Sequence, residues 1–215
     1  MYFWTMSKYK LNTKEKILEK ALELFNERGI EYVGIRELAA ELNIRVGNIT
    51  YYFPKKDDLV YELALNLNIL NSKIIVDNQK MNIQIFLEMF QKVFQNHIKY
   101  RCLLLSFVHL HSQNERFSKN YENTQQNRYE MLKTNLKTLI KTGNLNNLKS
   151  KEINFLVSSI AIIARFWISE AKISFTNLSD EDVINHYVSN IGRMLMPYLT
   201  SKGEKQLRSI LKKME

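Results

Sequence analysis

Residues 30–59 of the chain read IEYVGIRELAAELNIRVGNITYYFPKKDDL and predict two short helices joined by a turn. The first covers residues 35–42, because apolar residues recur at three- and four-residue spacings at Ile35, Leu38, Ala39 and Leu42. Asn43 is expected in the turn, since asparagine tolerates a positive φ. The second short helix covers residues 45–52 and ends before Phe53-Pro54, because the residue before a proline disfavours helical geometry.

A longer helix is expected just before this stretch, over residues 13–28. Its apolar stripe consists of Ile17, Leu18, Ala21, Leu22 and Phe25. Thr13 is the expected N-cap, and Gly29 is expected to end the helix because glycine readily adopts the left-handed conformation. Two short helices packed on a longer first helix form the arrangement of a DNA-binding helix-turn-helix.

The same residues resemble the N-terminal signature of the TetR family of transcriptional regulators. The resemblance covers about residues 13–62 and rests on Ile35-Arg36-Glu37-Leu38-Ala39, Gly47, the aromatic pair before Phe53, and Lys56-Asp57-Asp58-Leu59. It implies an all-α fold, with a three-helix DNA-binding domain in residues 11–56 and a larger helical effector-binding and dimerisation domain in residues 57–215. It also implies a regulator, most often a repressor, that binds an inverted-repeat operator as a homodimer and is released by a small-molecule effector.

Seven residues of the helix-turn-helix are candidates for binding double-stranded DNA. Arg36, Thr50, Tyr52 and Lys56 carry donors suited to phosphate oxygens, and such contacts fix position without reading sequence. Arg45, Asn48 and Tyr51 can face base edges, where arginine suits guanine and asparagine suits adenine. The alternative is that these are ordinary solvated side chains on a surface helix.

The rest of the chain also favours helices. The 215 residues include 6 Gly and 2 Pro, whereas an all-β protein of this length would need many turns rich in both. Further helices are expected over residues 57–77, 82–100, 103–111, 114–142, 151–175 and 180–199, followed by a charged helix at the end.

Composition bears on compartment and partners. The one cysteine, Cys102, cannot form a disulfide framework, and no stretch reaches the roughly 18 consecutive apolar residues of a membrane span. Residues 1–10 are expected to be a disordered tail rather than a signal peptide, which places the protein in the cytoplasm without a membrane partner. The net charge of +9 does not locate a DNA site, because residues 1–60 hold 10 Lys and Arg against 9 Asp and Glu.

An aromatic face on the helix over residues 82–100 is the candidate wall of an effector cavity. It consists of Phe86, Phe90, Phe94 and His97, with Leu104, Phe107, Tyr121, Tyr129 and Trp167 as opposite walls. Ligand sites between bundle helices are mostly apolar with a few polar anchors. The alternative is that these residues form ordinary core.

The last two long helices carry more apolar surface than one neighbour can cover, which predicts a four-helix homodimer interface. Its candidate residues are Ile160, Ile163, Phe166, Trp167, Ile184, Tyr187, Val188, Ile191 and Leu195. The alternative is that this surface lies wholly inside the core of one subunit.

The sequence predicts no catalytic residue, no metal site and no cofactor. It contains neither a Gly-rich phosphate loop nor a nucleophile elbow, and His109 and His111 point in different directions on a helix. A DNA-binding regulator is therefore the leading hypothesis. The competing one is a helical small-molecule-binding protein without DNA-binding activity, which the near-neutral charge of residues 1–60 favours.

Overall fold

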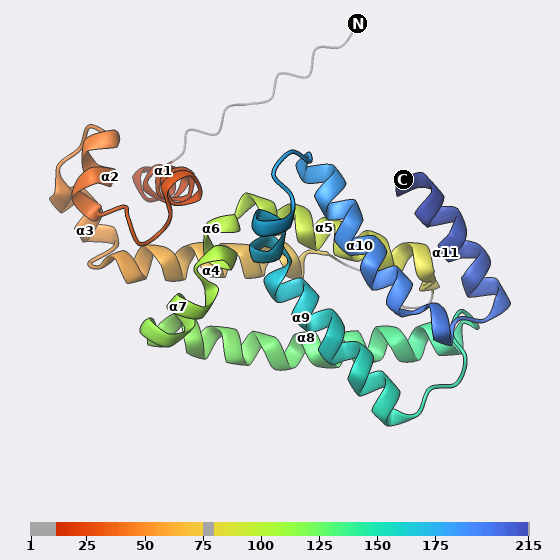
Figure 1. The fold of residues 1–215 in the computed structure, drawn as a ribbon. Helices are drawn as coiled ribbons and strands as arrows, with labels where there is room; N and C mark the ends of the chain where they lie inside the picture. Colours follow the sequence, from red (N-terminus) through yellow and green to blue (C-terminus); the bar gives the residue numbers. More distant parts are fainter. Residues whose placement is uncertain (1–11, 75–79, 215) are drawn as a thin grey trace, which may run out of the picture. The chain divides into compact units, whose positions relative to one another are not determined.

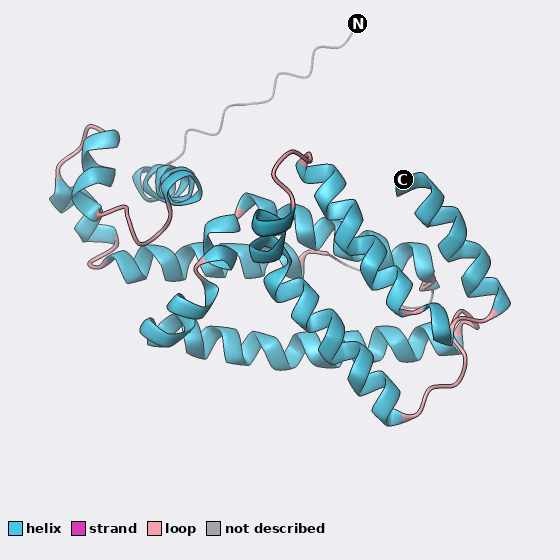
Figure 2. Ribbon diagram, in the orientation of Figure 1, coloured by secondary structure: helices cyan, strands magenta, loops and turns pink. Residues whose placement is uncertain are grey.

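The structure is a computed structural model that describes residues 12–74 and 80–214. Within these residues every regular element is helical, and one isolated β-bridge joins Leu145 to Leu199 (Figures 1 and 2). The all-α prediction is confirmed. The tail predicted over residues 1–10 lies outside the described residues.

The chain divides into two compact units, Met1–Leu63 and Ala64–Glu215. The division falls within α4 (Lys56–Ser72), later than the predicted boundary after Lys56. The first turns of α4 belong to the first unit because Leu59 and Val60 are buried there and Glu62 pairs with Lys14 at 2.8 Å.

The first unit contains α1 (Thr13–Arg28), α2 (Ile35–Glu41) and α3 (Val46–Tyr52). Its core comes from all three helices and includes Ile17, Ala21, Leu24, Phe25, Leu38 and Ile49. Leu24 takes the inward place predicted for Leu22, which is only half-buried. Asn43 adopts φ 52° between α2 and α3, as the sequence predicts.

The N-cap of α1 is Asn12, so the prediction of Thr13 was wrong by one residue. The Asn12 side chain accepts a hydrogen bond from the Glu15 backbone N–H, and the Glu15 carboxylate accepts one from the Asn12 N–H, both at 2.9 Å. This reciprocal capping box satisfies two free amides at once, which Thr13 cannot do because Glu15 is then only two residues away. Gly29 ends the helix with φ 95°, as expected.

The second unit holds the end of α4 and the remaining helices. These are α5 (Ile83–Lys99), α6 (Arg101–Leu105), α7 (Phe107–Gln113), α8 (Glu115–Lys141), α9 (Ser150–Ser174), α10 (Asp180–Met194), the short 3-10 helix η2 (Met196–Tyr198) and α11 (Ser201–Met214). Helix α10 packs on α5, α9 and α11, whereas α9 also contacts α6 and α8. The core of this unit therefore lies between α5, α9 and α10.

Two predicted helices are interrupted. The helix expected over residues 103–111 is two helices, because Ser106 has φ −92° and ψ 11° and redirects the chain between α6 and α7. The helix expected over residues 180–199 ends at Met194 and continues as η2, since Pro197 lacks the N–H that a continuous helix requires. Helix α4 ends at Ser72 rather than at residue 77.

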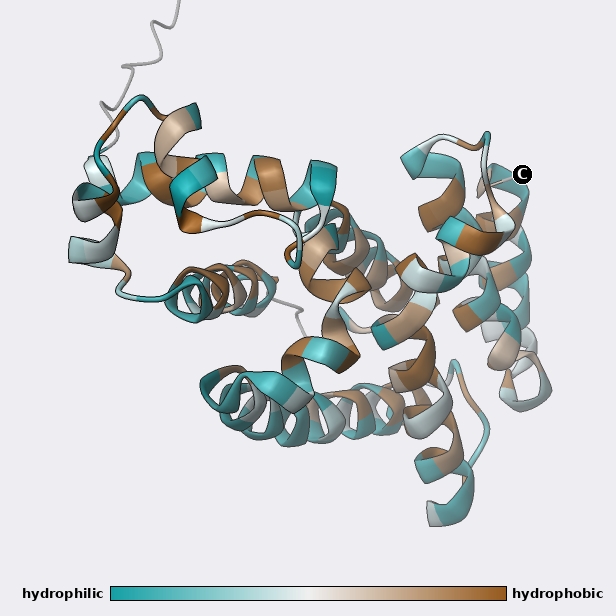
Figure 3. Ribbon diagram, turned by 60° about the vertical axis from the view of Figure 1, so that its left-hand side comes forward, coloured by the Kyte–Doolittle hydropathy of each residue, from teal (hydrophilic) through white to brown (hydrophobic). Residues whose placement is uncertain are grey.

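Helix α9 is apolar on two opposite sides, and brown, hydrophobic segments recur along it in Figure 3. One side is buried and includes Leu156, Val157, Ile160, Trp167 and Ile168. By length and hydropathy alone α9 would pass as a membrane span, but the core helix of a soluble protein passes the same test. Its packing on α6, α8 and α10 accounts for the buried side only.

Candidate functional site

Helix α3 is fixed by its inward side and exposes the opposite side. Ile49 is fully buried, and Phe53 is 2% exposed where the helix ends. Arg45, Asn48 and Tyr51 are exposed, and the Tyr51 side chain retains 80% of its accessible surface. The three residues predicted to face base edges are therefore available on the surface, and their role in DNA binding stays a prediction.

The predicted phosphate-binding residues have different surroundings. Arg36 and Tyr52 are exposed, whereas Thr50 is half-buried and its hydroxyl donates to the Gly47 carbonyl at 3.4 Å. The Lys56 ammonium donates to the backbone carbonyls of Ile30 at 2.8 Å and Glu31 at 3.4 Å. Lys56 therefore ties the first turn of α4 to the segment between α1 and α2, a role that the sequence did not predict.

Most carboxylates of α1 and α2 are paired with nearby cations. Arg28 contacts Glu37 at 2.5 Å and Glu41 at 3.3 Å, and the hydrogen bond that Arg28 donates to the Glu37 carboxylate raises the pKa of Arg28. Within the described ranges, Arg36 and Arg45 form no salt bridge. Among the described residues of this unit, Arg36 and Arg45 are therefore arginines without a carboxylate partner, although the net charge of residues 1–60 is near neutral.

Substitutions at Lys56 and Asn48 should distinguish a contact that positions the protein on DNA from one that reads the base sequence. We expect Lys56→Ala to weaken binding to all DNA sequences about equally and to lower the salt slope by about one, because phosphates carry no base information. It should also destabilise the fold by about 1 kcal/mol, since two carbonyls lose a donor. Asn48→Ala should instead relax preference at one base pair by about 1–3 kcal/mol without a change in melting temperature.

Fluorescence anisotropy on matched and scrambled duplexes over a range of salt concentrations measures both effects. If the two variants lost the same amount of affinity on both the matched and the scrambled duplex, this division of roles would be contradicted.

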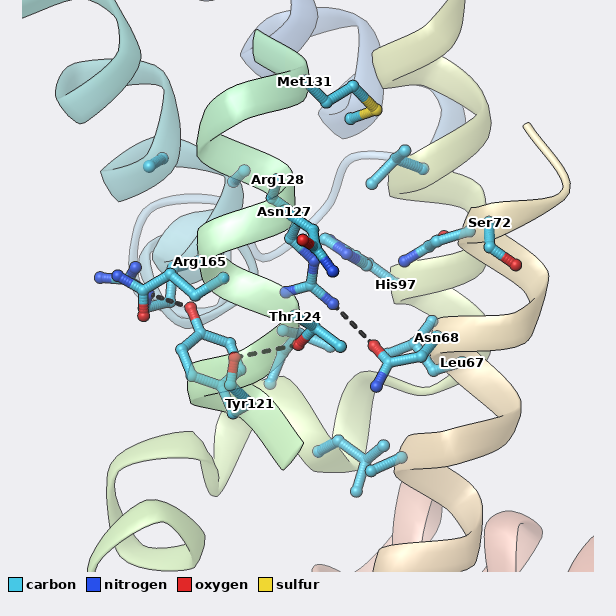
Figure 4. A pocket seen from close by; sticks show the side chains of 18 of the residues that line it. Leu67, Asn68, Ser72, His97, Tyr121, Thr124, Asn127, Arg128, Met131 and Arg165 are labelled. Carbon is cyan, nitrogen blue, oxygen red and sulfur yellow. Dashed lines mark hydrogen bonds between the residues drawn. The ribbon is translucent and has the colours of Figure 1, made fainter. Parts of the chain in front are cut away.

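The second unit contains a cavity of about 360 Å³ between the end of α4 and helices α5 to α9 (Figure 4). Six of the nine predicted wall residues line it: Phe90, His97, Leu104, Phe107, Tyr121 and Tyr129. Phe86, Phe94 and Trp167 are not among its lining residues. They are at most 1% exposed, and the Phe94 ring stacks on Trp167 at 4.7 Å within the core.

Two arginines line the cavity and were missed as ligand contacts. The Arg128 guanidinium donates to the Asn68 side-chain oxygen at 2.7 Å, which joins α8 to α4. The Arg165 Nε donates to the Tyr121 hydroxyl at 2.6 Å, and the two guanidinium carbons each lie 5.6 Å from the Tyr121 ring centroid. Figure 4 shows Tyr121 between Arg165 and Arg128. The sequence signal was Arg165, a charge within an otherwise apolar stretch.

His97 is held neutral at the inner end of the cavity. Its Nδ1 accepts a hydrogen bond from the Trp167 indole N–H at 3.2 Å, so Nδ1 cannot carry a proton without losing that bond. Burial lowers the pKa of His97 to about 3, and the positive charge of Arg128 contributes in the same direction. Among the described residues, no group of three His, Cys, Asp or Glu is placed to hold a metal ion.

Most residues predicted for the dimer interface are buried within the single chain. Ile160, Trp167, Ile184, Tyr187, Val188, Ile191 and Leu195 are at most 6% exposed in the single chain, so they offer little surface to a second copy, and their role in a dimer stays a prediction. They are buried because α10 packs on α5, α9 and α11, more neighbours than the sequence suggested. Ile163 is half-buried and Phe166 is exposed.

Four exposed apolar residues form a separate surface on α9, here called the outer stripe. It consists of Phe155, Ile162, Phe166 and Ile173. These residues are spaced by seven, four and seven positions and so share one helix face. The same spacing could have been read from the sequence, which instead favoured the residues of the buried side.

Comparisons with known proteins agree with this architecture. The family model described as "Bacterial regulatory proteins, tetR family" matches residues 17–63, and the model described as "Bacterial transcriptional repressor" matches residues 69–207.

Two curated relatives are similar to parts of the chain. The probable HTH-type transcriptional regulator YttP of Bacillus subtilis (strain 168) is 40% identical over 55 residues, or 26% of this chain and 27% of that protein. The biofilm operon icaADBC HTH-type negative transcriptional regulator IcaR of Staphylococcus aureus (strain Newman) is 28% identical over 112 residues, or 50% of this chain. The chain spans only 27% and 58% of the lengths of these two proteins.

A solved structure matches almost the whole fold. The crystal structure of a TetR-family transcriptional regulator from Marinobacter aquaeolei VT8 has a TM-score of 0.88 and 19% sequence identity. The match covers 95% of this chain and 100% of that chain. With both family models and this fold in agreement, the chain belongs to the TetR family of bacterial transcriptional regulators.

Proposed function

We propose that this protein is a cytoplasmic transcriptional repressor, without enzymatic activity, that binds an inverted-repeat operator as a homodimer and leaves it when a small-molecule effector binds. The observation that carries the proposal is the exposed side of α3. Arg45, Asn48 and Tyr51 stand on a helix that Ile49 anchors in the core, and Arg45 has no carboxylate partner among the described residues. An exposed helix face of this kind, with an arginine at its N-cap, suits the major groove of DNA.

The outer stripe of α9 supports the homodimer. Four large apolar side chains on one face of a long helix are unfavourable in water, and a second copy of the same face would cover them. A two-fold contact of this kind presents two equivalent copies of α3. The operator should therefore be an inverted repeat whose centres are spaced by the helical repeat of DNA.

Helix α4 offers a route for release by an effector. Its first residue, Lys56, holds the segment before α2, and Asn68 near its end accepts the hydrogen bond from Arg128 in the cavity. An effector that takes Arg128 away from Asn68 would change the contacts of the helix that supports the DNA-binding unit. A ligand shifts this equilibrium only as far as it prefers one state.

A gel-shift with DNA flanking the gene, followed by footprinting, tests DNA binding. We expect two protected half-sites related by a two-fold axis. Absence of binding to any flanking fragment would favour the competing hypothesis, a small-molecule-binding protein without DNA-binding activity. Protection of one asymmetric half-site would contradict the dimer.

Calorimetry with and without operator DNA tests release once an effector is available. By linkage, operator DNA should weaken effector binding by the same factor as the effector weakens operator binding, typically about 5- to 150-fold. Equal effector affinity in the two titrations would rule out release by this equilibrium.

A further inference from the structure

The charged side chains that line the cavity all have the same sign. Its described lining residues include Arg128 and Arg165 and contain no aspartate or glutamate. The other polar groups that line it are neutral, such as Asn68, Thr124 and Asn127, which Figure 4 shows around Arg128. His97, the remaining titratable base, is held neutral by burial. The interior is therefore cationic.

Neither arginine is neutralised within the part of the chain that the structure describes. Arg128 has Asn68 and the face of Tyr121 as partners, and Arg165 has the Tyr121 hydroxyl and the faces of Tyr121 and Phe166. Burial lowers the pKa of Arg128, and the charge of Arg165 adds to this effect. A guanidinium nevertheless stays charged in a protein, so this buried charge is uncompensated and destabilises the unliganded fold.

The remaining wall of the cavity is apolar. Leu67 on α4, Phe90 and Val93 on α5, Leu104 on α6 and Phe107 on α7 line it. A volume of about 360 Å³ is at the small end of ligand sites in proteins. The site can therefore enclose a short apolar group while a charged head remains beside the arginines.

We propose that the effector is a small amphipathic anion, with an anionic oxygen head group bound by Arg128 and an apolar body against α5, α6 and α7. This inference rests on the proposed function, because it names the chemical class of the molecule that would release the operator. A guanidinium fork matches the two oxygens of a carboxylate and also binds phosphate esters. Among the described lining residues a cation finds no counter-charge, and a neutral molecule leaves the arginine charges uncompensated.

Isothermal titration calorimetry with three ligands of equal chain length tests the charge preference. We expect decanoate to bind, and 1-decanol to bind with an affinity roughly tenfold lower or lower still. Decyltrimethylammonium should not bind, because of these three head groups only the carboxylate pairs with a guanidinium. Decyl phosphate, as a fourth ligand, distinguishes a carboxylate site from a phosphate site. If 1-decanol binds as tightly as decanoate and decyl phosphate, the inference is wrong.

Arg128→Met locates the head group, since methionine keeps an apolar side chain of similar length without the charge. The substitution should lower the affinity for decanoate roughly 10- to 100-fold and leave the affinity for 1-decanol unchanged. Arg116→Met is the matched control, because Arg116 is an exposed arginine on the same helix and does not line the cavity. Without ligand, Arg128→Met should melt at a higher temperature than the unmodified protein, whereas Arg116→Met should not.

Arg165→Met provides a second variant should Arg128→Met not fold, and it should also weaken decanoate. Unchanged decanoate affinity in the folded arginine variants would overturn the inference. The effect of decanoate on operator affinity is a separate test from its binding to the cavity. If decanoate binds through Arg128 but leaves operator affinity unchanged, the anion site stands and release by an effector is wrong.

Discussion

Ile162→Glu on the outer stripe of α9 is expected to convert the protein from dimers to monomers and to lower operator affinity on the order of 100-fold or more. Ile162 is 58% exposed in the single chain, so the charge should leave the fold of the subunit intact. In a two-fold contact each substitution acts twice and places two carboxylates in an apolar interface. Once the dimer is lost, the second half-site no longer binds in concert with the first.

Sedimentation at micromolar concentration measures the oligomeric state, and anisotropy measures the operator affinity. Val108→Glu is the matched control, because Val108 is also exposed and apolar but lies on α7, outside the stripe. It should leave both quantities unchanged. Ile191→Glu should behave differently from either, since Ile191 is fully buried and a charge there should unfold the subunit. A dimer that survives Ile162→Glu would show that the stripe is not the interface.

His97 should make the protein unstable in acid by an amount large enough to measure in one titration series. Its pKa is about 3 in the folded chain and 6.5 as the ordinary value. Below pH 6.5 His97 therefore binds a proton in the unfolded chain but not in the folded chain. The free energy of unfolding consequently falls as the pH falls. The slope is about 1.4 kcal/mol per pH unit, which amounts to about 2–3 kcal/mol between pH 6.5 and 4.5.

Urea denaturation at a series of pH values measures this loss, and His97→Gln should remove it. Glutamine can still accept the hydrogen bond from the Trp167 indole N–H, so the variant should remain folded. His109→Gln, which changes an exposed histidine, should keep the loss. A His97→Gln variant with the same pH dependence as the unmodified protein would mean that His97 becomes protonated in the folded state.

The sequence by itself determined the helices and the helix-turn-helix, because both depend on residues close together in the chain. Gly29 and Asn43 have the positive φ values that their residue types favour, and the apolar spacing of residues 35–42 produces α2. The family signature lies in one continuous stretch and could be recognised without any tertiary contact. Errors at this level were small, such as the N-cap of α1 at Asn12 rather than Thr13.

Only the tertiary structure decided which apolar face is covered and which charges meet. Periodicity shows that α9 and α10 are apolar, but it does not show that α5 and α11 already cover α10 and leave the outer stripe of α9 exposed. The hydrogen bond from Arg128 to Asn68 joins positions 60 residues apart, and the one from Trp167 to His97 joins positions 70 apart. Such contacts depend on how the helices pack, since local spacing specifies the direction of a side chain on its own helix and not the neighbour that it meets.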